Sequence, residues 1–295
     1  MNQRAMEHAL GKLVMDSELR GAGLMKGNSR GIALITGASS GIGAVYADRL
    51  AHRGHDLMLV ARDRQRLDAL ATRVRDETGR SVEVVAADLS DKADLARVEE
   101  VLRTNAGITV LVNNAGIAMS GDLASADPDR LESMIRLNVL APSRLALAAI
   151  PGFIARGRGT LINISSVLAL APERFNGAYS GTKAYLLNLS LRLQQEVGNK
   201  GVRVQVVLPG ATRTAIWEKA GTDIESLPPG IVMAVDDMVD AALAGLDRGE
   251  TVTIPALPDM AQWEAYEAAR QKMIPNLSLS APAARYGVAV AGGAQ

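Results

Sequence analysis

The feature of this 295-residue chain that most constrains its fold is an alternation of short apolar runs with longer segments of helical period. From residue 31 onward, runs rich in β-branched residues are separated by segments whose apolar residues recur at helical spacing. Several runs are apolar throughout, which is typical of parallel strands covered by helices on both faces. The runs are GIALIT, DLMLVA, SVEVVA, ITVLVN, TLINIS, VRVQVV and TVTI. The sequence therefore predicts an α/β fold, a doubly wound and mostly parallel sheet of about seven strands in a single domain.

Residues that commonly begin or end helices stand between these runs. Gly54 and Gly79 follow the last periodic residues of two expected helices, and glycine is the usual residue just past a helix C-terminus. Pro128 follows Asp127, which is a good N-cap residue. The punctuation supports the boundaries that the periodicity predicts.

We expect one catalytic domain over residues 30–256, preceded by a flexible extension, 1–29, and followed by a helical segment and tail, 257–295. Residues 211–235 lack a clean period, and a connection of that length is often a lid or binding loop.

Composition argues against several classes of partner. The 32 basic residues balance the 32 acidic ones, so no global field draws in nucleic acid or an anionic membrane. We find no apolar run of the roughly 18 residues that a bilayer span needs, and no compact apolar core of a secretory signal in the first 29 residues. The chain contains no cysteine, which fits a reducing compartment. We expect a cytoplasmic protein that binds neither nucleic acid nor membranes.

A glycine-rich stretch, TGASSGIG at 36–43, lies where the first strand meets the first helix. Glycines allow close approach of a phosphate, and the helix N-terminus offers unpaired N–H donors. The spacing of Gly37, Gly41 and Gly43 is GxxxGxG, which is not the GxGxxG fingerprint. An ordinary tight turn is the alternative interpretation.

The stretch AYSGTKAY places Tyr179 and Lys183 four positions apart, on one face of a helix. A cation about 4 to 6 Å away typically lowers the pKa of a neighbouring group by 1 to 3 units. Such a pair would bring the tyrosine pKa closer to neutral pH. The alternative is a surface pair without a function.

Together these motifs resemble the short-chain dehydrogenase/reductase family over about residues 30–255. The resemblance rests on TGASSGIG, NNAG at 113–116, ISS at 164–166, YSGTK at 179–183 and PG at 209–210, in this order and spacing. Ser166 precedes Tyr179 by 13 positions, as is typical of that family. YSGTK stands where YSASK is more common.

The resemblance implies a catalytic set of Ser166, Tyr179, Lys183 and Asn138. Tyr179 would exchange a proton with the substrate oxygen, Ser166 would hydrogen-bond that oxygen, and Lys183 would hold the nicotinamide ribose. An oxidised nicotinamide would add positive charge and lower the Tyr179 pKa further. Asn138 would hold a water between Lys183 and bulk solvent, or else it is a satisfied polar residue of a helix.

The resemblance also implies a set of cofactor-binding residues at the ends of strands. Besides Tyr179 and Lys183 they are Gly37, Ser39, Ser40, Gly41, Ile42, Gly43, Arg62, Asp88, Leu89, Asn114, Ala115, Gly116, Pro209, Gly210, Thr212 and Thr214. A cap or turn role is the alternative for Asp88, and a plain turn is the alternative for NNAG.

The second strand ends in Ala61, where an enzyme of this kind that uses NAD usually has an acidic residue for the ribose 2′-hydroxyl. Arg62 follows, and a guanidinium there can pair with a 2′-phosphate. Asp63 is expected to cap the next helix. The sequence predicts NADP(H) in preference to NAD(H), unless Arg62 is only a solvated loop residue.

The function expected is hydride transfer between NADP and a carbonyl/alcohol pair. A non-catalytic redox sensor or scaffold is the main alternative, although it would not need the proton donor. A sugar-nucleotide epimerase also has Tyr-x-x-x-Lys, but usually has another glycine spacing and a larger substrate domain.

The substrate site is expected to be apolar, since its candidate walls are Ile117, Ala118, Met119, residues 168–170, Ile216 and Trp217. No metal is expected, because His8, His52 and His55 lack metal-ligand spacing and are expected to be solvated. We expect a homodimer or homotetramer that pairs through helices at about 128–156 and 177–198. Exposed small and apolar residues are expected to form that surface, namely Ala146, Ala149, Leu187 and Leu191.

Overall fold

The protein is described here by a computed structural model that places residues 29–221, 223–228 and 230–288. The expectations for residues 1–28, His8 among them, lie outside the described residues. The described residues form one sheet of seven strands in the order β3-β2-β1-β4-β5-β6-β7, and each neighbouring pair is parallel. The strands are β1 (Ile32–Thr36), β2 (Asp56–Ala61), β3 (Val82–Ala86), β4 (Ile108–Asn113), β5 (Gly159–Ile164), β6 (Val202–Val207) and β7 (Val252–Thr253). The predicted doubly wound α/β fold is confirmed.

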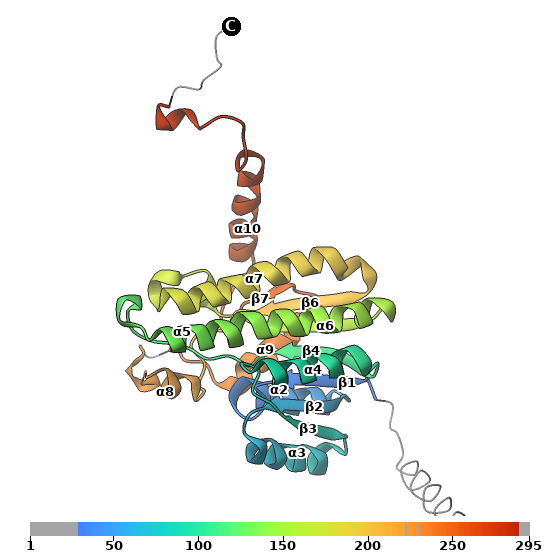
Figure 1. The fold of residues 1–295 in the computed structure, drawn as a ribbon. Helices are drawn as coiled ribbons and strands as arrows, with labels where there is room; N and C mark the ends of the chain where they lie inside the picture. The colour runs from blue at the N-terminus through green and yellow to red at the C-terminus, as the bar shows by residue number, and fades with distance from the viewer. Residues whose placement is uncertain (1–28, 222, 229, 289–295) are drawn as a thin grey trace, which may run out of the picture. The chain divides into compact units, whose positions relative to one another are not determined.

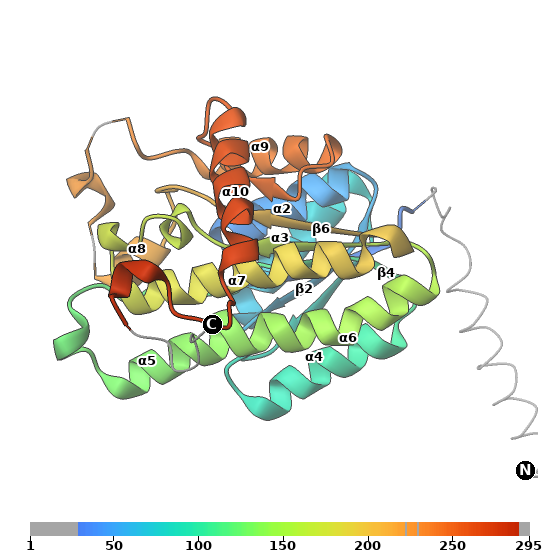
Figure 2. The same ribbon diagram turned by 90° about the horizontal axis from the view of Figure 1, so that it is seen from above.

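Helices cover both faces of the sheet. Figures 1 and 2 show α4, α6 and α7 side by side on one face, whereas α2, α3 and α9 pack on the other. These six are α2 (Gly41–His52), α3 (Arg64–Thr78), α4 (Lys92–Thr104), α6 (Ala141–Ala155), α7 (Gly177–Val197) and α9 (Val235–Asp247). Two shorter helices, α5 (Pro128–Ile135) and α8 (Ile216–Ala220), lie in the connections after β4 and β6. Each face of the sheet therefore has its own apolar core.

The strand order reverses at β1, which pairs with β2 on one side and β4 on the other. The crossovers after β1 and after β4 consequently lead to opposite sides of this point. In open parallel sheets, ligands bind at the carboxyl ends of the strands beside such a switch point. The glycine-rich stretch follows β1 directly and lies at that edge.

The expected helix boundaries are present. Gly79 ends α3 with a φ of 66°, in the left-handed region that favours glycine. The Asp127 carboxylate accepts a bond of 3.0 Å from the Asp129 N–H at the start of α5. The Asp63 carboxylate accepts a bond of 3.0 Å from the Arg66 N–H, so it caps α3 as expected.

Buried amides join the sheet to α7. The Asn113 amide of β4 donates to the Asn163 side-chain oxygen of β5 over 3.0 Å. The Asn163 amide in turn donates to the Ser190 hydroxyl of α7 over 2.8 Å. All three side chains are buried, where an unpaired polar group is costly, so the network fixes the position of α7 against the sheet.

One stretch corrects the sequence prediction about membrane spans. Pro128–Ala155, which comprises α5, a π-helical turn at Arg136–Leu140 and α6, is long and apolar enough to cross a membrane by length and composition. The prediction that no such run exists is therefore wrong. Leu145, Ala149 and Phe153 of this stretch pack into the core on the α4 side of the sheet. That packing accounts for their apolar character.

The chain divides into two compact units, with the boundary between Pro255 and Ala256. In the second unit α10 (Ala261–Met273) contains the rings of Trp263 and Tyr266, whose centroids lie 5.4 Å apart.

Candidate active site

The turn after β1 is built to receive a negatively charged group. Gly37 and Gly41 have φ values of 65° and 56°, which only glycine adopts readily. Ser40, the N-cap residue of α2, makes no side-chain capping bond, and the first turn of α2 has no acidic residue. The N–H groups and the positive end of the α2 dipole are therefore available to an anion. Ser39 belongs to the same turn, and Ile42 lies in the first turn of α2.

Asn114, just beyond β4, holds this turn in place. Its amide donates to the carbonyls of Thr36 and Gly37 over 2.8 and 3.2 Å. A Cβ on Gly43 would stand only 2.5 Å from the Asn114 amide and from the Gly37 carbonyl oxygen. Gly43 is needed for this close approach.

Thr36 is a residue of the site that the sequence reasoning missed. Its hydroxyl accepts bonds of 3.0 Å from the N–H groups of Asn114 and Ala115. The threonine that opens TGASSGIG was the available signal, because a hydroxyl at a strand end can bond the neighbouring strand. Thr36 thereby ties the glycine turn to the NNAG segment.

Asn138 lies in the π-helical turn and is 1% exposed. Its side-chain oxygen accepts from the Ile117 N–H over 3.0 Å, and its amide donates to the Ile117 carbonyl over 2.8 Å. The amide also donates to the Thr182 hydroxyl over 3.2 Å. These bonds fit the alternative of a satisfied polar residue, and the water relay stays a prediction.

Tyr179 and Lys183 stand one turn apart on α7, and both are buried. The Lys183 ammonium donates to the Ile164 carbonyl at the end of β5 over 3.0 Å, and it lies 5.6 Å from the centroid of the Tyr179 ring. Ser166, two residues beyond β5, lies beside the Tyr179 phenol. The fold therefore brings the four predicted catalytic residues to one edge of the sheet.

The electrostatics of the pair correct one expectation. Burial raises the pKa of Tyr179 to about 12, and the nearby Ser166 hydroxyl only partly opposes this effect. Burial likewise lowers the pKa of Lys183 to about 8. The expectation that Lys183 by itself lowers the Tyr179 pKa is wrong, because desolvation is the larger effect. A lowered pKa requires a further positive charge beside the phenol, such as an oxidised nicotinamide.

The residues expected near the adenosine end of the cofactor, Arg62 and Asp88, lie just beyond β2 and β3. Ala61 supplies no carboxylate, and the Arg62 side chain is 67% exposed with one guanidinium nitrogen 3.7 Å from an Asp88 oxygen. The other Asp88 oxygen accepts from the Ser90 N–H over 2.9 Å, which is the turn role named as its alternative. Leu89 is buried beneath this turn. An exposed ion pair of this kind is weak, so Arg62 remains able to pair with a phosphate.

The remaining residues expected to bind the cofactor follow β6. The Pro209 carbonyl accepts from the Val167 N–H over 3.0 Å, next to Ser166, and the Thr212 hydroxyl donates to the Gly210 carbonyl over 3.1 Å. The Thr214 methyl group would stand 3.2 Å from a Cβ on Gly41. The segment after β6 therefore meets both the catalytic residues and the glycine turn.

An apolar cluster surrounds the Tyr179 ring and contains much of the expected substrate wall. Ile117, Ala118 and Leu168 are partly buried in it, whereas Met119 is buried beneath the surface and forms a floor. Phe175 was missed by the sequence reasoning; its ring makes edge-on contacts with those of Tyr179 and Trp217, with centroids 5.7 and 6.3 Å apart. Only its position four residues before Tyr179 could have indicated it.

The residues present fit a dinucleotide. A Cβ on Gly116 would stand 3.1 Å from the Asn138 oxygen and 3.5 Å from the Lys183 ammonium, so the missing side chain leaves a cradle beside the cation. The Arg62 guanidinium, the anion-receptive turn and this cradle follow β2, β1 and β4, which are neighbours in the sheet, in the order that a 2′-phosphate, a pyrophosphate and a nicotinamide ribose require.

His52 and His55 lie away from the candidate site. The His52 Nδ1 lies 3.0 Å from the Asp48 carbonyl oxygen on α2, and the His55 Nδ1 lies 3.2 Å from the Gly31 carbonyl oxygen. His55 is half-buried, not solvated as expected, and burial lowers its pKa. Within the described residues, no cluster of three metal-ligating side chains occurs.

Comparisons with known proteins agree on one family. A family model described as short chain dehydrogenase matches residues 31–225. The structure of a short-chain dehydrogenase from Sphingobium yanoikuyae in complex with NADPH is 52% identical, with a TM-score of 0.85 over 87% of this chain and 99% of that one. A bulky-bulky ketone specific alcohol dehydrogenase from Comamonas testosteroni is 44% identical, with a TM-score of 0.81 over 88% and 99% of the two chains. Human 17-beta-hydroxysteroid dehydrogenase type 3 is 31% identical over 205 residues, and this chain spans 64% of its length.

We expect the wild-type protein to gain stability relative to Lys183→Met as the pH rises. Burial holds the Lys183 pKa at about 8, below its ordinary value of 10.5, so between these values the unfolded chain binds more protons than the folded one. From about pH 7 to about pH 9.5, the wild-type free energy of unfolding should rise by about 2 kcal/mol relative to that of the variant. Urea unfolding at both pH values measures this difference.

Lys200→Met is the matched control, because Lys200 is exposed just beyond α7. It should follow the wild type at both pH values. If the free energy of unfolding changed with pH equally in the wild type and in Lys183→Met, burial would not lower the Lys183 pKa as described.

Proposed function

The chain belongs to the short-chain dehydrogenase family, and on that premise we propose that it is an oxidoreductase, a carbonyl reductase that transfers hydride between NADP(H) and a carbonyl/secondary alcohol pair. The observation that carries the proposal is the convergence of Ser166, Tyr179 and Lys183 beside the glycine turn and the Gly116 cradle. The residues that would hold the cofactor follow the ends of neighbouring strands, and Tyr179 and Lys183 are the ones that would lie at its nicotinamide end.

The protein's part in the reaction is to supply a proton and to hold the oxygen that receives it. The bound cofactor would supply the hydride that forms the new C–H bond. Tyr179 gives its phenolic proton to the carbonyl oxygen, and in the reverse direction it accepts the hydroxyl proton of the alcohol. Ser166 donates a hydrogen bond to the same oxygen and stabilises its developing negative charge. Lys183 would hold the ribose and, as a cation, favours the tyrosinate that proton transfer leaves.

The intact proton donor separates this proposal from the alternatives. A redox sensor needs the glycine turn but gains nothing from a buried tyrosine beside a serine. A sugar-nucleotide epimerase usually has a larger substrate domain, whereas the catalytic unit of this chain ends at Pro255.

The substrate we propose is a ketone with large apolar substituents, or the matching alcohol. The apolar cluster around Tyr179 and the Phe175 and Trp217 rings support this class. A relative described as specific for bulky-bulky ketones also supports it. A panel of carbonyls and alcohols, screened with both cofactors by the absorbance of the reduced nicotinamide, tests the proposal. Turnover only of small, hydrophilic carbonyls would contradict it.

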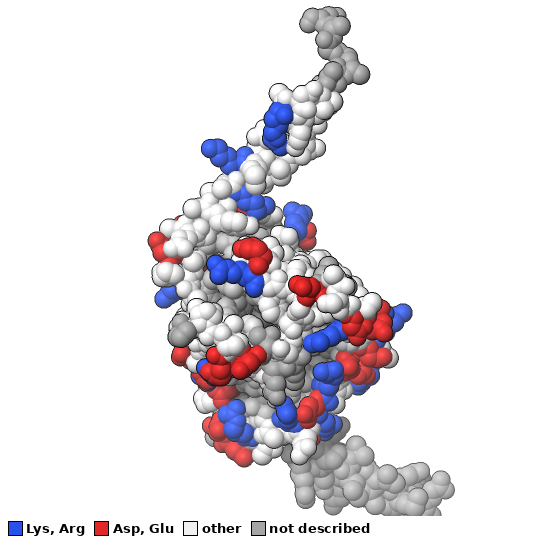
Figure 3. All heavy atoms as spheres, turned by 90° about the vertical axis from the view of Figure 1, so that its left-hand side faces the viewer, with Lys and Arg blue, Asp and Glu red and all other residues white. Residues whose placement is uncertain are grey.

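A small-molecule substrate also agrees with the surface charge. On the side of the molecule that Figure 3 shows, basic and acidic side chains are interspersed, as expected for a chain with a net charge of zero. We propose a cytoplasmic location without nucleic-acid or membrane partners, supported by this balance and by the absence of cysteine.

We further propose a homodimer or homotetramer formed through the face of α6 and α7. The residues named from the sequence need correction, because Ala146, Ala149 and Leu187 are buried within the chain. The exposed apolar side chains there are instead Leu140, Leu147 and Tyr185, and Leu147 is 70% exposed. The Ser143 hydroxyl donates to the Tyr185 hydroxyl over 3.0 Å and so joins the two helices.

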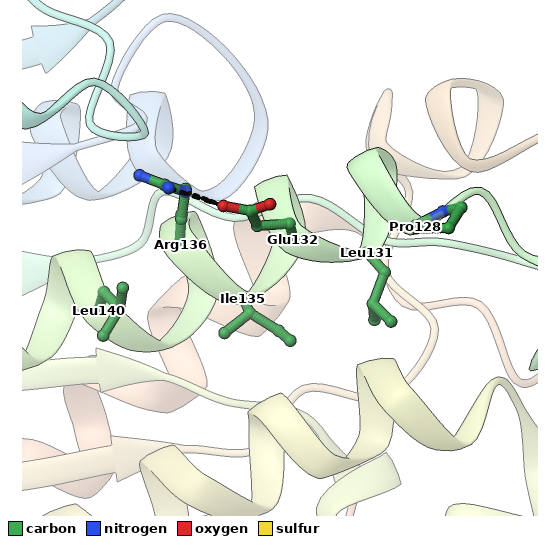
Figure 4. A pocket seen from close by; sticks show the side chains of 6 residues that line it. All are labelled: Pro128, Leu131, Glu132, Ile135, Arg136 and Leu140. Atoms are coloured by element: carbon green, nitrogen blue, oxygen red, sulfur yellow. Dashed lines mark hydrogen bonds and ion pairs between the residues drawn. The ribbon is translucent and has the colours of Figure 1, made fainter.

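A cavity of about 330 Å³ extends this face along α5. In Figure 4, Leu131, Ile135 and Leu140 project on one side of the helix, whereas Glu132 and Arg136 pair with each other on another side. Apolar surface of this kind is what a second subunit would cover.

Tyr179→Phe should remove nearly all turnover but leave NADPH affinity close to that of the wild type. The ring still packs against Phe175 in the variant, but the transferable proton is gone. Steady-state rates with the best carbonyl of the panel, together with calorimetric NADPH binding, measure both effects. Tyr185→Phe, an exposed tyrosine on the same helix, is the control and should retain activity. More than about a tenth of wild-type turnover in Tyr179→Phe would overturn the assignment.

Arg62→Ala should weaken NADPH binding by roughly 1.5 to 3 kcal/mol and barely change NADH binding, since only the 2′-phosphate engages a charge-assisted bond. Calorimetry at one ionic strength measures both constants. Arg64→Ala is the control, because that neighbouring guanidinium pairs with Asp68 on α3. Equal affinities of the unmutated protein for the two cofactors would refute the preference for NADP.

Leu147→Asp should convert the wild-type oligomer into a monomer of 31.1 kDa, because a charge at the centre of the apolar face opposes association. Light scattering at micromolar concentration measures the mass. Leu279→Asp, equally exposed but in the second unit, should leave the mass unchanged. A wild-type protein that is already monomeric would end this proposal.

A further inference from the structure

Asn176, the residue before α7, makes an unusual number of bonds for a cap. Its side-chain oxygen accepts from the N–H groups of Ala178 and Tyr179 over 3.0 and 3.2 Å. Its side-chain amide donates to the Gly121 carbonyl over 2.7 Å. The residue is 7% exposed, so these bonds form away from solvent. One side chain therefore contacts both the backbone of Tyr179 and the segment after β4.

The backbone of Tyr179 is fixed from its other side as well. The Thr182 hydroxyl donates to the Tyr179 carbonyl over 2.7 Å, and the same hydroxyl accepts from the Asn138 amide. Asn176 and Asn138 thus hold the peptide groups on either side of the Tyr179 Cα.

The same two asparagines hold both ends of residues 117–121, which we term the wall segment because Ile117 and Ala118 belong to the apolar substrate wall. Asn138 exchanges two bonds with Ile117 at its start, and Asn176 bonds Gly121 at its end. Next to Gly121, the Ser120 hydroxyl donates to the Ala220 carbonyl at the end of α8. The wall segment therefore connects the loop of residues 211–235 with the start of the catalytic helix.

We propose that Asn176 is a positioning residue with two separable tasks. Through its side-chain oxygen Asn176 orients Tyr179. Through its amide it holds the wall segment, and with it α8, at the distance from Tyr179 that the substrate requires. The inference rests on the proposed role of Tyr179. A change of about 1 Å in the position of a catalytic group can cost about 100-fold in rate, so bonds that set such positions are visible in kinetics.

The two tasks are separated by two substitutions. Asn176→Ser keeps an N-cap oxygen but lacks the amide that reaches Gly121, so the wall segment loosens while Tyr179 stays fixed. For the best ketone of the panel we expect a KM raised about 5- to 10-fold and a kcat within about 3-fold of the wild type. Asn176→Ala removes both bonds, and kcat should fall by about 10-fold or more in addition to the rise in KM.

Ser120→Ala tests the wall segment from its other end. It leaves Asn176 and its cap intact but removes the bond to Ala220, so KM should rise with kcat little changed. Because both single changes loosen one segment, the double variant Ser120→Ala/Asn176→Ser should raise KM by less than the product of the single effects.

Asp91→Ala is the matched control for a purely structural effect. Asp91 caps α4 through two N–H groups, those of Ala93 and Asp94, as Asn176 caps α7. It should lower the melting temperature, as loss of a cap does, with unchanged kcat and KM. NADPH affinity should be the same in all these variants.

The proposal is overturned if Asn176→Ser and Ser120→Ala both have wild-type KM, or if Asn176→Ser lowers kcat as much as Asn176→Ala. It is also overturned if Asp91→Ala changes the kinetics equally. These outcomes are distinct from failure of the proposed function, which would appear as retained turnover in Tyr179→Phe.

Discussion

The bond between the Lys183 ammonium and the Ile164 carbonyl is the interaction on which the rest of the site depends. It joins the catalytic turn of α7 to the end of β5, and a buried cation keeps such a bond because losing it would leave the charge unpaired. The same burial that makes the bond firm also lowers the Lys183 pKa and raises that of Tyr179. Tyr179 is therefore a poor acid, and the charge of the neighbouring Lys183 is itself destabilised by burial. In our account, the positive charge of an oxidised nicotinamide beside the phenol would lower the Tyr179 pKa.

The parallel sheet explains why residues far apart in sequence meet at this bond. Strands β1, β4, β5 and β6 end at one edge, so the glycine turn, Asn114, Ser166 and Pro209 emerge there together. Side-chain bonds to backbone groups then fix the loops at their starts, as Asn114 does for the glycine turn and Asn138 for Ile117.

Much of this arrangement was predictable from the sequence, because it follows from local patterns. Apolar runs and caps such as Asp63 and Asp127 depend on neighbouring residues, and the motif order placed Ser166, Tyr179 and Lys183 at strand ends or on a helix. The rise of the Tyr179 pKa in the protein without a cofactor was not predicted, since burial is a property of the fold. Asn176 was missed because its partner Gly121 lies far along the chain. Phe175 was missed because the sequence does not show which way its ring points. Leu147 is exposed whereas its neighbour Ala146 is buried. The spacing of apolar residues alone does not show which of two adjacent helical positions faces the core.

The central claim is that this site transfers hydride to a carbonyl carbon while Tyr179 protonates the oxygen. Its most direct test uses NADPH with deuterium on one face of the nicotinamide C4, a bulky aryl ketone and analysis of the product by mass spectrometry. With deuterium on the reactive face, the account predicts an alcohol that carries one deuterium on the carbinol carbon, and with deuterium on the opposite face it predicts none. An alcohol without deuterium from either labelled cofactor would contradict direct hydride transfer, and with it the function proposed for this site.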